Sequence, residues 1–455
     1  MAAAIDTSKL EPDFVNVDRQ AQWAFSPGGL KYWLWMLFCA FLTALGGAFW
    51  MHQVYYTFDS TGYGQPTMWA VYITNFVFWV GIAHSGTLIS AILYLFRVRW
   101  RTGIFRLAET MTVFAVATAG LFPLIHLGRV WFFYWLVPYP NERSLQPDFR
   151  SPLVWDLFAI STYLTISVLF LFTGMIPDIA NAREKAVGWR KTFYSILSFG
   201  WQGTDRQWRN FSMVYLLLAG FATPLVLSVH SVVSWDFAMT QLPGWHSTIF
   251  APYFVAGAIF SGCALVLTLA IPMRRFMNLK GLITIWHLDN LAKVVLLTSV
   301  VMAYSYATES FTVWYTQDPI ELMTFHQRYF GPQGYMFWIM VTCNCAIPML
   351  LFIPRVRTNT TWLFIISIFI NIGMWLERFV IIAGSLATNA DPSQWKFYIP
   401  RWTEILITVG SFGWFLMNFS LFAKFLPIVS TTELKEGIKY LKQAVREIYP
   451  YRKAA

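Results

Sequence analysis

The chain has 455 residues, of which 57% are hydrophobic and only 12% are charged. Soluble globular proteins carry about 25% charged residues. The composition therefore excludes an ordinary soluble enzyme, a disordered protein and a nucleic-acid-binding domain, despite a formal net charge of +10. In a membrane protein such a surplus of Lys and Arg is expected to be concentrated on one side of the bilayer.

Ten stretches are apolar enough to cross a bilayer, which takes about 20 residues as a helix. They are predicted at residues 31–55, 67–96, 110–136, 153–176, 210–235, 248–273, 290–314, 334–354, 362–386 and 401–427. Their apolar character is continuous, whereas the strands of a membrane barrel alternate in hydrophobicity. The predicted fold class is therefore an all-α integral membrane protein with about ten transmembrane helices.

The distribution of basic residues predicts the orientation. Lys and Arg are concentrated in the N-terminal segment, in residues 97–109, 177–209, 274–289 and 355–361, and in the C-terminal tail. The loops on the other side hold only Arg143, Arg150, Arg328, Lys396 and Arg401. Because cytoplasmic loops carry the excess of Lys and Arg, both termini are predicted to be cytoplasmic.

The order of the segments suggests two copies of a four-helix unit. AHSGTLISAILYLF in span 2 and AIFSGCALVLTLAI in span 6 are each followed by a basic segment and three further spans. We expect repeats at 67–235 and 248–386, flanked by spans 1 and 10 within a membrane domain of residues 31–427. Residues 1–30 form a cytoplasmic segment, and residues 428–455 a basic cytoplasmic helix that binds either a partner or anionic lipid.

Ionisable side chains inside the predicted spans are few, and each is a candidate functional residue because charge in hydrocarbon is costly. In the first repeat these residues are His84, His126, Arg129, Asp156, His230 and Asp236. The second repeat adds Asp289, Lys293, Glu309, Glu377 and Arg378, and Glu404 lies at the start of span 10.

His126 and Asp156 are the predicted catalytic pair. His126 lies in the outer half of span 3, with Arg129 expected on the same helix face three residues later. Asp156 lies near the outer start of span 4, and we expect both residues to face one outward-opening cavity together with Tyr163. A neutral imidazole accepts a proton and a carboxylate orients it, which suits a lipid-soluble quinol. The alternative is a His–Asp link between helices without a ligand.

The remaining candidates have structural alternatives. His84, Arg129, Tyr163, His230 and Asp236 are predicted to contact the quinol. A hydrogen bond between helices is the alternative for His84, and an interfacial position for Asp236. Asp289, Glu309, Glu377 and Arg378 are predicted to form a proton pathway. A compensated Glu377–Arg378 pair and an Asp289–Lys293 ion pair are the alternatives.

The sequence predicts no haem or iron–sulfur cluster bound by this chain. Two haems stacked between helices need two His residues about 13–14 positions apart on one span, and no span has them. Because no redox centre is evident, electrons from a quinol have to leave to a partner subunit.

The ten spans, the two repeats and the segment LIHLGRVWFFYWLVPYPNERSLQPDFRSPLVWDLFAISTY resemble the NrfD/polysulfide-reductase family of membrane subunits over nearly the whole chain. Within that family, the segment is most similar to ActC-type subunits of alternative complex III. The resemblance implies a multi-pass subunit of the bacterial cytoplasmic membrane that oxidises menaquinol near the periplasmic face, with His126 and Asp156 at the matching positions. The resemblance also implies that the chain works as one subunit of a quinol:cytochrome c oxidoreductase complex and is not active alone. Proton translocation is a further function that the resemblance implies.

The resemblance also implies partners. These are an iron–sulfur subunit (ActB-like), multihaem and monohaem cytochrome c subunits (ActA-like and ActE-like), a second NrfD-like subunit (ActF-like) and other small membrane subunits.

Two other classes of function are kept open. A secondary transporter of the parallel-repeat type would have broken helices at matching positions of the two repeats. Pro123, Pro224, Pro252 and Pro348 do not correspond in this way, which disfavours transport. A structural anchor of the ActF type, without a quinol site, predicts that replacing His126 or Asp156 leaves turnover intact.

Overall fold

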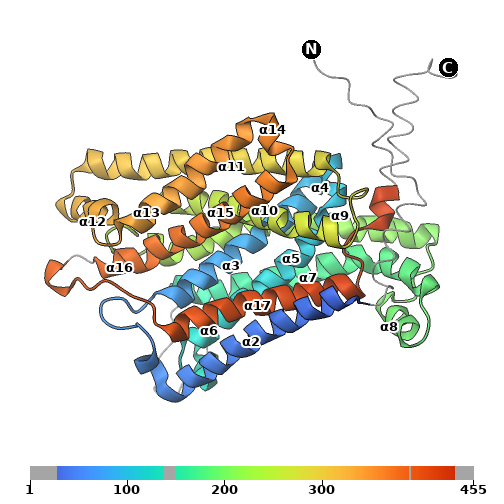
Figure 1. Ribbon diagram of the computed structural model, residues 1–455, viewed down its shortest axis with the longest axis horizontal. Helices are drawn as coiled ribbons and strands as arrows, with labels where there is room; N and C mark the ends of the chain where they lie inside the picture. The colour runs from blue at the N-terminus through green and yellow to red at the C-terminus, as the bar shows by residue number, and fades with distance from the viewer. Residues whose placement is uncertain (1–27, 138–148, 389–390, 436–455) are drawn as a thin grey trace, which may run out of the picture.

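A computed structural model of the protein describes residues 28–137, 149–388 and 391–435. This part of the chain is helical and contains no β-strand apart from one isolated bridge between Gly64 and Thr67. Ten of its helices are long and apolar enough to cross a membrane, which confirms the predicted fold class (Figure 1). The spans lie side by side along one common direction.

Six spans are single helices: α2 (Leu30–Tyr56), α7 (Pro152–Lys185), α9 (Asp205–Ala238), α10 (Phe250–Phe276), α11 (Ile285–Thr316) and α17 (Trp402–Phe425). Four spans are interrupted: α3 (Val71–Thr87) with α4 (Leu93–Leu95), α5 (Phe105–Ala119) with α6 (Leu121–His126), α13 (Gly334–Val341) with the turns to Phe352, and α15 (Thr360–Phe379) with α16 (Ser385–Ala387). The short helices α8 (Trp189–Leu197), α12 (Pro319–Phe330) and α14 (Pro354–Arg357) lie between spans.

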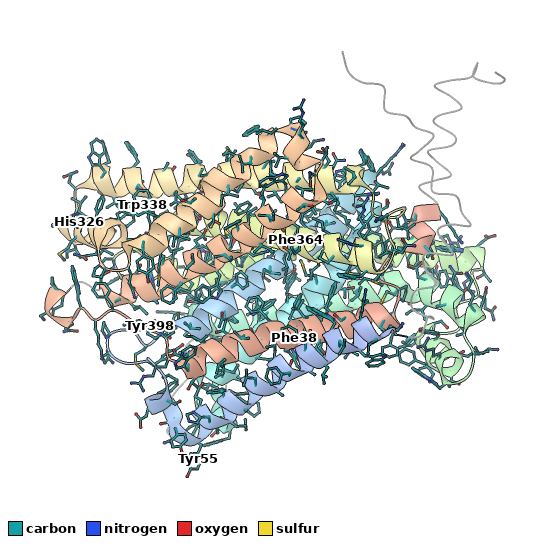
Figure 2. The ribbon with its side chains drawn as sticks, in the orientation of Figure 1. Phe38, Tyr55, His326, Trp338, Phe364 and Tyr398 are labelled. Atoms are coloured by element: carbon teal, nitrogen blue, oxygen red, sulfur yellow. The ribbon has the colours of Figure 1, made fainter. Side chains whose placement is uncertain are left out.

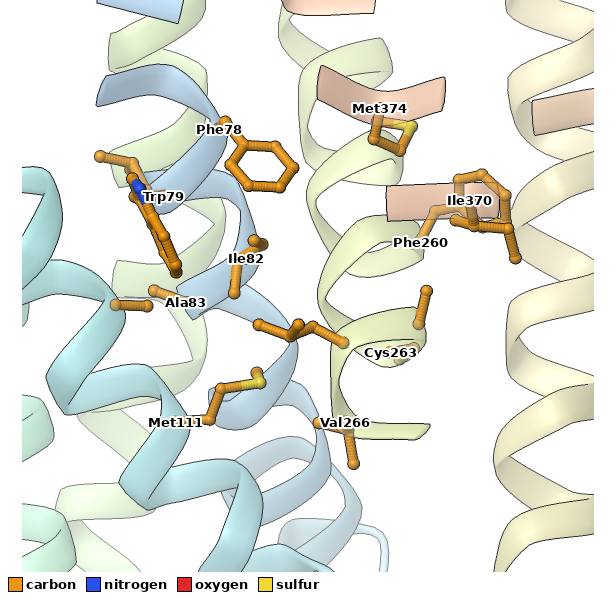
Figure 3. Packing of buried hydrophobic residues seen from close by; sticks show 14 of the residues in the cluster. Phe78, Trp79, Ile82, Ala83, Met111, Phe260, Cys263, Val266, Ile370 and Met374 are labelled. Atoms are coloured by element: carbon orange, nitrogen blue, oxygen red, sulfur yellow. The ribbon is translucent and has the colours of Figure 1, made fainter. Parts of the chain in front are cut away.

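The centre of the bundle is the contact between α3 and α10. α3 packs directly on α10, and Ile82 of α3, Cys263 of α10 and Met111 of α5 belong to one buried hydrophobic cluster (Figure 3). The peripheral helices instead expose large apolar side chains, such as Phe38 on α2 and Trp338 on α13 (Figure 2). Exposed apolar side chains are expected on a surface that faces lipid.

The helices of the two halves pair in the same way. In the first half α3 packs on α5 and α7 on α9, and in the second half α10 packs on α11 and α13 on α15. Two four-helix repeats would have this arrangement. The first and last spans, α2 and α17, pack on each other, and a Cβ atom on Gly46 would lie 2.6 Å from the Cα atom of Gly410. Only glycines permit such close helix packing.

The two ends of the bundle differ in their loops. The Tyr32 hydroxyl donates to the Ser420 carbonyl at 3.3 Å, so α2 begins where α17 ends. We call this the basic end, since its segments 97–104, 186–204, 277–284 and 353–359 each carry Lys or Arg. The distal end comprises residues 57–70, 127–137, 239–249, 317–333 and 391–401. That the basic end and both termini are cytoplasmic remains a prediction from charge.

The third span differs most from its prediction. It was expected at residues 110–136, but its helix begins at Phe105 and ends at His126. Gly128, with φ +68°, ends the helix, and residues 130–136 form a separate 3-10 turn with exposed aromatic side chains. The aromatic run therefore belongs to the distal end. The fourth and fifth spans are longer than predicted, because polar turns extend them beyond their apolar parts.

The predicted C-terminal helix begins as expected, with the Glu433 amide donating to the Ser430 hydroxyl at 3.4 Å. Its remainder lies outside the described residues, as does nearly all of the N-terminal segment 1–30.

Candidate quinol site at the distal end

His126 is the last residue of α6 and lies at the distal end. Its ring centroid is 5.8 Å from that of Tyr63, in the loop between α2 and α3. Its Nδ1 atom is buried and has no hydrogen-bond partner in the described part of the chain. Because buried polar atoms are nearly always paired, this nitrogen is available to a ligand.

Asp156 lies one turn into α7, behind Pro152 at the first helical position, where proline is favoured. Its carboxyl group lies within hydrogen-bonding reach of the carboxyl group of Asp236 on α9, and both residues are buried. A carboxylate only accepts hydrogen bonds, so this pair requires a proton on one of the two groups. The Oδ1 atoms of both residues lack partners among the described residues.

The structure differs from the predicted pairing of His126 with Asp156 and from the predicted position of Arg129. No ion pair joins His126 to Asp156 within the described residues, and the partner of Asp156 is Asp236. Arg129 does not share the helix face of His126, because the helix ends first; its side chain is exposed. The expected three-residue spacing holds only within a helix. The structure therefore places two separate groups, His126 and the Asp156–Asp236 pair, in the distal part of the first half.

His84, Tyr163 and His230 form a deeper cluster. The His84 ring stacks on Tyr163 at 5.1 Å and lies 4.6 Å from the His230 ring. The Tyr163 hydroxyl donates to the Ala83 carbonyl at 2.9 Å and pairs with the Thr87 hydroxyl at 2.7 Å. Tyr163 therefore links α7 to α3. His84 Nε2 and both ring nitrogens of His230 have no partner in the described chain.

The candidates of the second half lie in two places, because Glu309 and Glu377 line one small cavity while Asp289 lies at the opposite end of the bundle, and each acid has a basic partner. Glu377 pairs with Arg378 and accepts a hydrogen bond from Tyr306 in the core. At the distal end, Arg328 pairs with Glu309 at 3.1 Å. At the basic end, Asp289 accepts from Lys293 at 2.8 Å and from Arg357 at 2.5 Å. The contacts favour the compensated-pair alternatives for Glu377 and Asp289.

One buried charged cluster was not anticipated. Arg106 lies 3.5 Å from Glu109 and 3.3 Å from Asp178, and the Tyr215 hydroxyl donates to Glu109 at 3.1 Å. The predicted spans 110–136 and 153–176 stop just short of all three charged residues. An Arg and a Glu three residues apart, directly before a long apolar run, were the available signal.

The distal groups provide hydrogen-bond acceptors at two positions, His126 and the Asp156–Asp236 pair. His126 Nδ1 and the Oδ1 atoms of Asp156 and Asp236 are buried acceptors that the described chain leaves unused. The described residues hold no group of three or more His, Cys, Asp or Glu side chains arranged for a metal ion. A quinol, with a hydroxyl group at each end, matches such acceptors.

Fold and site together define an integral membrane protein with ten candidate spans in its described part and with buried ionisable groups at one end of the helix bundle. The family described as "Polysulphide reductase, NrfD" matches residues 59–390, and the chain belongs to this family.

Three curated relatives are similar over most of their length. The chain is 26% identical to a putative membrane subunit of dimethyl sulfoxide reductase from Halobacterium salinarum, over 83% of this chain and 87% of the relative. It is 21% identical to an Hdr-like menaquinol oxidoreductase integral membrane subunit of Archaeoglobus fulgidus, over 78% and 79%. It is 22% identical to a menaquinone reductase integral membrane subunit of Nitratidesulfovibrio vulgaris, over 76% and 79%. All three are membrane subunits of oxidoreductases.

Proposed function

We propose that this chain is the quinol-binding membrane subunit of an oxidoreductase complex, with its quinol site at the distal end of the first half. The observation that carries the proposal is the set of buried, unpartnered acceptor atoms on His126, Asp156 and Asp236. Two relatives whose names contain menaquinol or menaquinone support a naphthoquinol as the substrate.

The finer form of the proposal is an ActC-type subunit of alternative complex III. Its distal end then faces the periplasm, and an iron–sulfur subunit sits at that end beside cytochrome c subunits. The asymmetry of the loop charges supports this sidedness. The chain acts only within the complex, because it provides no evident route for electrons to leave the site on its own.

The chemistry assigned to this chain is proton acceptance. Quinol oxidation releases two electrons and two protons. The His126 imidazole takes one proton at Nδ1, and the Asp156–Asp236 pair, which already shares a proton, takes the second on its free carboxylate. Both groups lie at the distal end, so the protons leave to that side, while the electrons pass to the partner subunit.

The two other classes of function fit the structure less well. A transporter of the parallel-repeat type needs matching breaks in both halves. The π-helical turns lie at residues 88–92 in the second span and at 342–346 and 380–384 in the eighth and ninth, which are not corresponding positions. A structural anchor gives no reason for unpartnered acceptors buried at one end of the bundle.

Binding of a naphthoquinol tests the proposal. Menadiol, which carries the two hydroxyl groups that these acceptors require, is titrated calorimetrically under anaerobic conditions into the purified complex that contains this chain. We expect His126→Ala and Asp156→Asn each to raise the dissociation constant about tenfold, since the first removes an acceptor and the second replaces a carboxylate acceptor by a neutral amide. His326→Ala, an exposed histidine on α12, is the matched control. Unchanged binding in both site variants would refute the proposed site.

A further inference from the structure

The helix end that carries His126 is held by a residue from the first span. Gln53 of α2 is fully buried, and its amide Nε2 donates to the Ile125 carbonyl at 3.0 Å. The same carbonyl also accepts from the Gly128 amide at 3.2 Å, so the Gln53 bond ties the peptide directly before His126, in the last turn of α6, to α2. Gln53 is fixed in turn, because the Tyr72 hydroxyl donates to its Oε1 atom at 2.7 Å.

The ring of His126 is bounded by Tyr63. This tyrosine stacks on Tyr72, with ring centroids 5.3 Å apart, and lies 5.8 Å from the imidazole. Its hydroxyl accepts a hydrogen bond from the Tyr72 amide at 3.1 Å. The Tyr398 ring packs edge to face on the Tyr63 ring, with their centroids 6.0 Å apart. Four aromatic rings therefore meet at the end of α6.

The loop that carries Tyr63 is held by the last span. Glu404, at the distal start of α17, is fully buried and accepts from the amides of Gly62 and Arg401 at 2.7 and 2.8 Å and from the Tyr398 hydroxyl. A Cβ atom on Gly62 would lie 2.4 Å from the Ile399 carbonyl oxygen, so the two loops meet backbone to backbone. Figure 2 shows Tyr398 at this end of the bundle.

Glu404 meets the requirement for a buried carboxylate, which needs several donors. Burial raises the pKa of the Tyr398 phenol, and the charge of Glu404 raises it further. The phenol therefore stays a hydrogen-bond donor through neutral pH. The three donors join segments 61–63 and 391–401 to α17.

We infer that Gln53 and Glu404 are positioning residues for the proposed quinol site: Gln53 fixes the backbone that carries His126, and Glu404 fixes the loop that places Tyr63 against its ring. The inference rests on the proposed function. It gives α2 and α17, the two spans outside the expected repeats, a direct role in the site.

Positioning of His126 affects the rate because proton transfer depends on geometry. Proton transfer needs the acceptor within hydrogen-bond reach of the donor, about 2.6–3.2 Å between heavy atoms. A displacement of about 1 Å costs up to about 10²-fold in rate. Losing the Gln53 bond frees the last turn of α6, which His126 terminates, without removing any acceptor of the quinol.

Steady-state oxidation of menadiol by the purified complex tests the inference with Gln53→Leu and Glu404→Ala. We expect kcat per assembled complex to fall about tenfold, whereas the KM and the dissociation constant for menadiol stay within about threefold of wild type. Thr43→Val on α2 and Asn418→Leu on α17 are matched controls, because each removes a side-chain hydrogen bond to a carbonyl of its own helix, away from the site.

Conservative variants separate positioning from general stability. Glu404→Gln keeps an acceptor oxygen for the Gly62 and Arg401 amides, so we expect it to restore most of kcat. Gln53→Glu keeps the acceptor for Tyr72 but removes the donor to the Ile125 carbonyl, so we expect it to behave like Gln53→Leu. If Glu404→Ala fails to assemble, Tyr398→Phe removes one of the three donors and should lower kcat severalfold.

The results of these experiments distinguish failure of the positioning inference from failure of the proposed quinol site. Unchanged kcat in the Gln53 and Glu404 variants, with His126→Ala inactive, would overturn the inference and leave the quinol site intact. Less assembled complex with normal kcat per complex would also overturn it, since the role would then be structural. Full activity of His126→Ala would overturn the proposed function itself.

Discussion

The carboxyl groups of Asp156 on α7 and Asp236 on α9 lie within hydrogen-bonding reach of each other at the distal end of the bundle. The neighbouring Trp155 and Trp235 rings pack edge to face at 6.1 Å, so the two helix ends are in contact there. Two like charges do not share one site without a proton, so this pair holds one. It therefore behaves as one group with two carboxyls.

Asp236→Asn tests whether this pair takes part in turnover. The Asn amide can donate to the Asp156 carboxylate, so the contact between α7 and α9 is preserved while the shared proton is lost. We expect turnover of menadiol to fall about 10²-fold, as for removal of a general base, with unchanged assembly. Wild-type turnover in Asp236→Asn would show that Asp156 acts without its partner.

Tyr163→Phe tests whether this tyrosine is a quinol contact or a link between helices. Its hydroxyl is already bonded to the Ala83 carbonyl and the Thr87 hydroxyl. We expect a loss of about 1 kcal/mol of stability, visible as a lower melting temperature, because one buried hydroxyl partner is removed. Turnover per complex should be unchanged. A loss of turnover without a loss of stability would make Tyr163 a ligand contact.

The docking of the C-terminal segment is expected to depend on pH. Glu433 accepts from Arg101 at 2.6 Å. Burial raises the pKa of the Glu433 carboxyl group, and the neighbouring Arg101 opposes the rise. Because the pKa of Glu433 is raised in the folded state, the docked segment is stabilised while this carboxyl group is protonated, at pH values below the ordinary Glu range. That stabilisation is lost as the pH rises through the folded-state pKa. Limited proteolysis of the tail should therefore be faster near neutral pH than at acidic pH.

Glu433→Gln is the control for this pH effect. The glutamine keeps one acceptor for Arg101 but does not titrate, so the rate of proteolysis should become independent of pH over that range. Arg183→Gln, on the neighbouring α7 but bonded to Ser198 and the Trp201 carbonyl, should keep the wild-type dependence. Equal pH dependence in Glu433→Gln would assign the effect to another group.

The fold class was predictable because lipid imposes it. A bilayer leaves no partner for exposed backbone groups, so ten continuous apolar runs had to become ten helices. Helix ends were less predictable, because apolar and aromatic residues also occupy the interface. The run after Gly128 is the example: its side chains are as apolar as the span, but a positive φ turns the chain out of the helix.

The sequence indicates candidate site residues, which stay predictions, but it does not determine their pairings. His126 and Asp156 were identified because charge and imidazole are costly in hydrocarbon. That Asp156 pairs with Asp236 depends on the rotation of α7 against α9, which spacing along one helix does not determine. Gln53 was missed because an amide is uncharged, although it is fully buried and holds the helix end beside His126.

Turnover of the assembled complex is the most direct test that His126 and Asp156 form the quinol site. Oxidation of menadiol is measured for wild type, His126→Ala and Asp156→Asn, with assembly checked for each. We predict a loss of about 10²-fold or more in both variants, the scale expected for removing a general base. Wild-type rates in both would contradict the account, and would leave this chain as an anchor for the redox subunits.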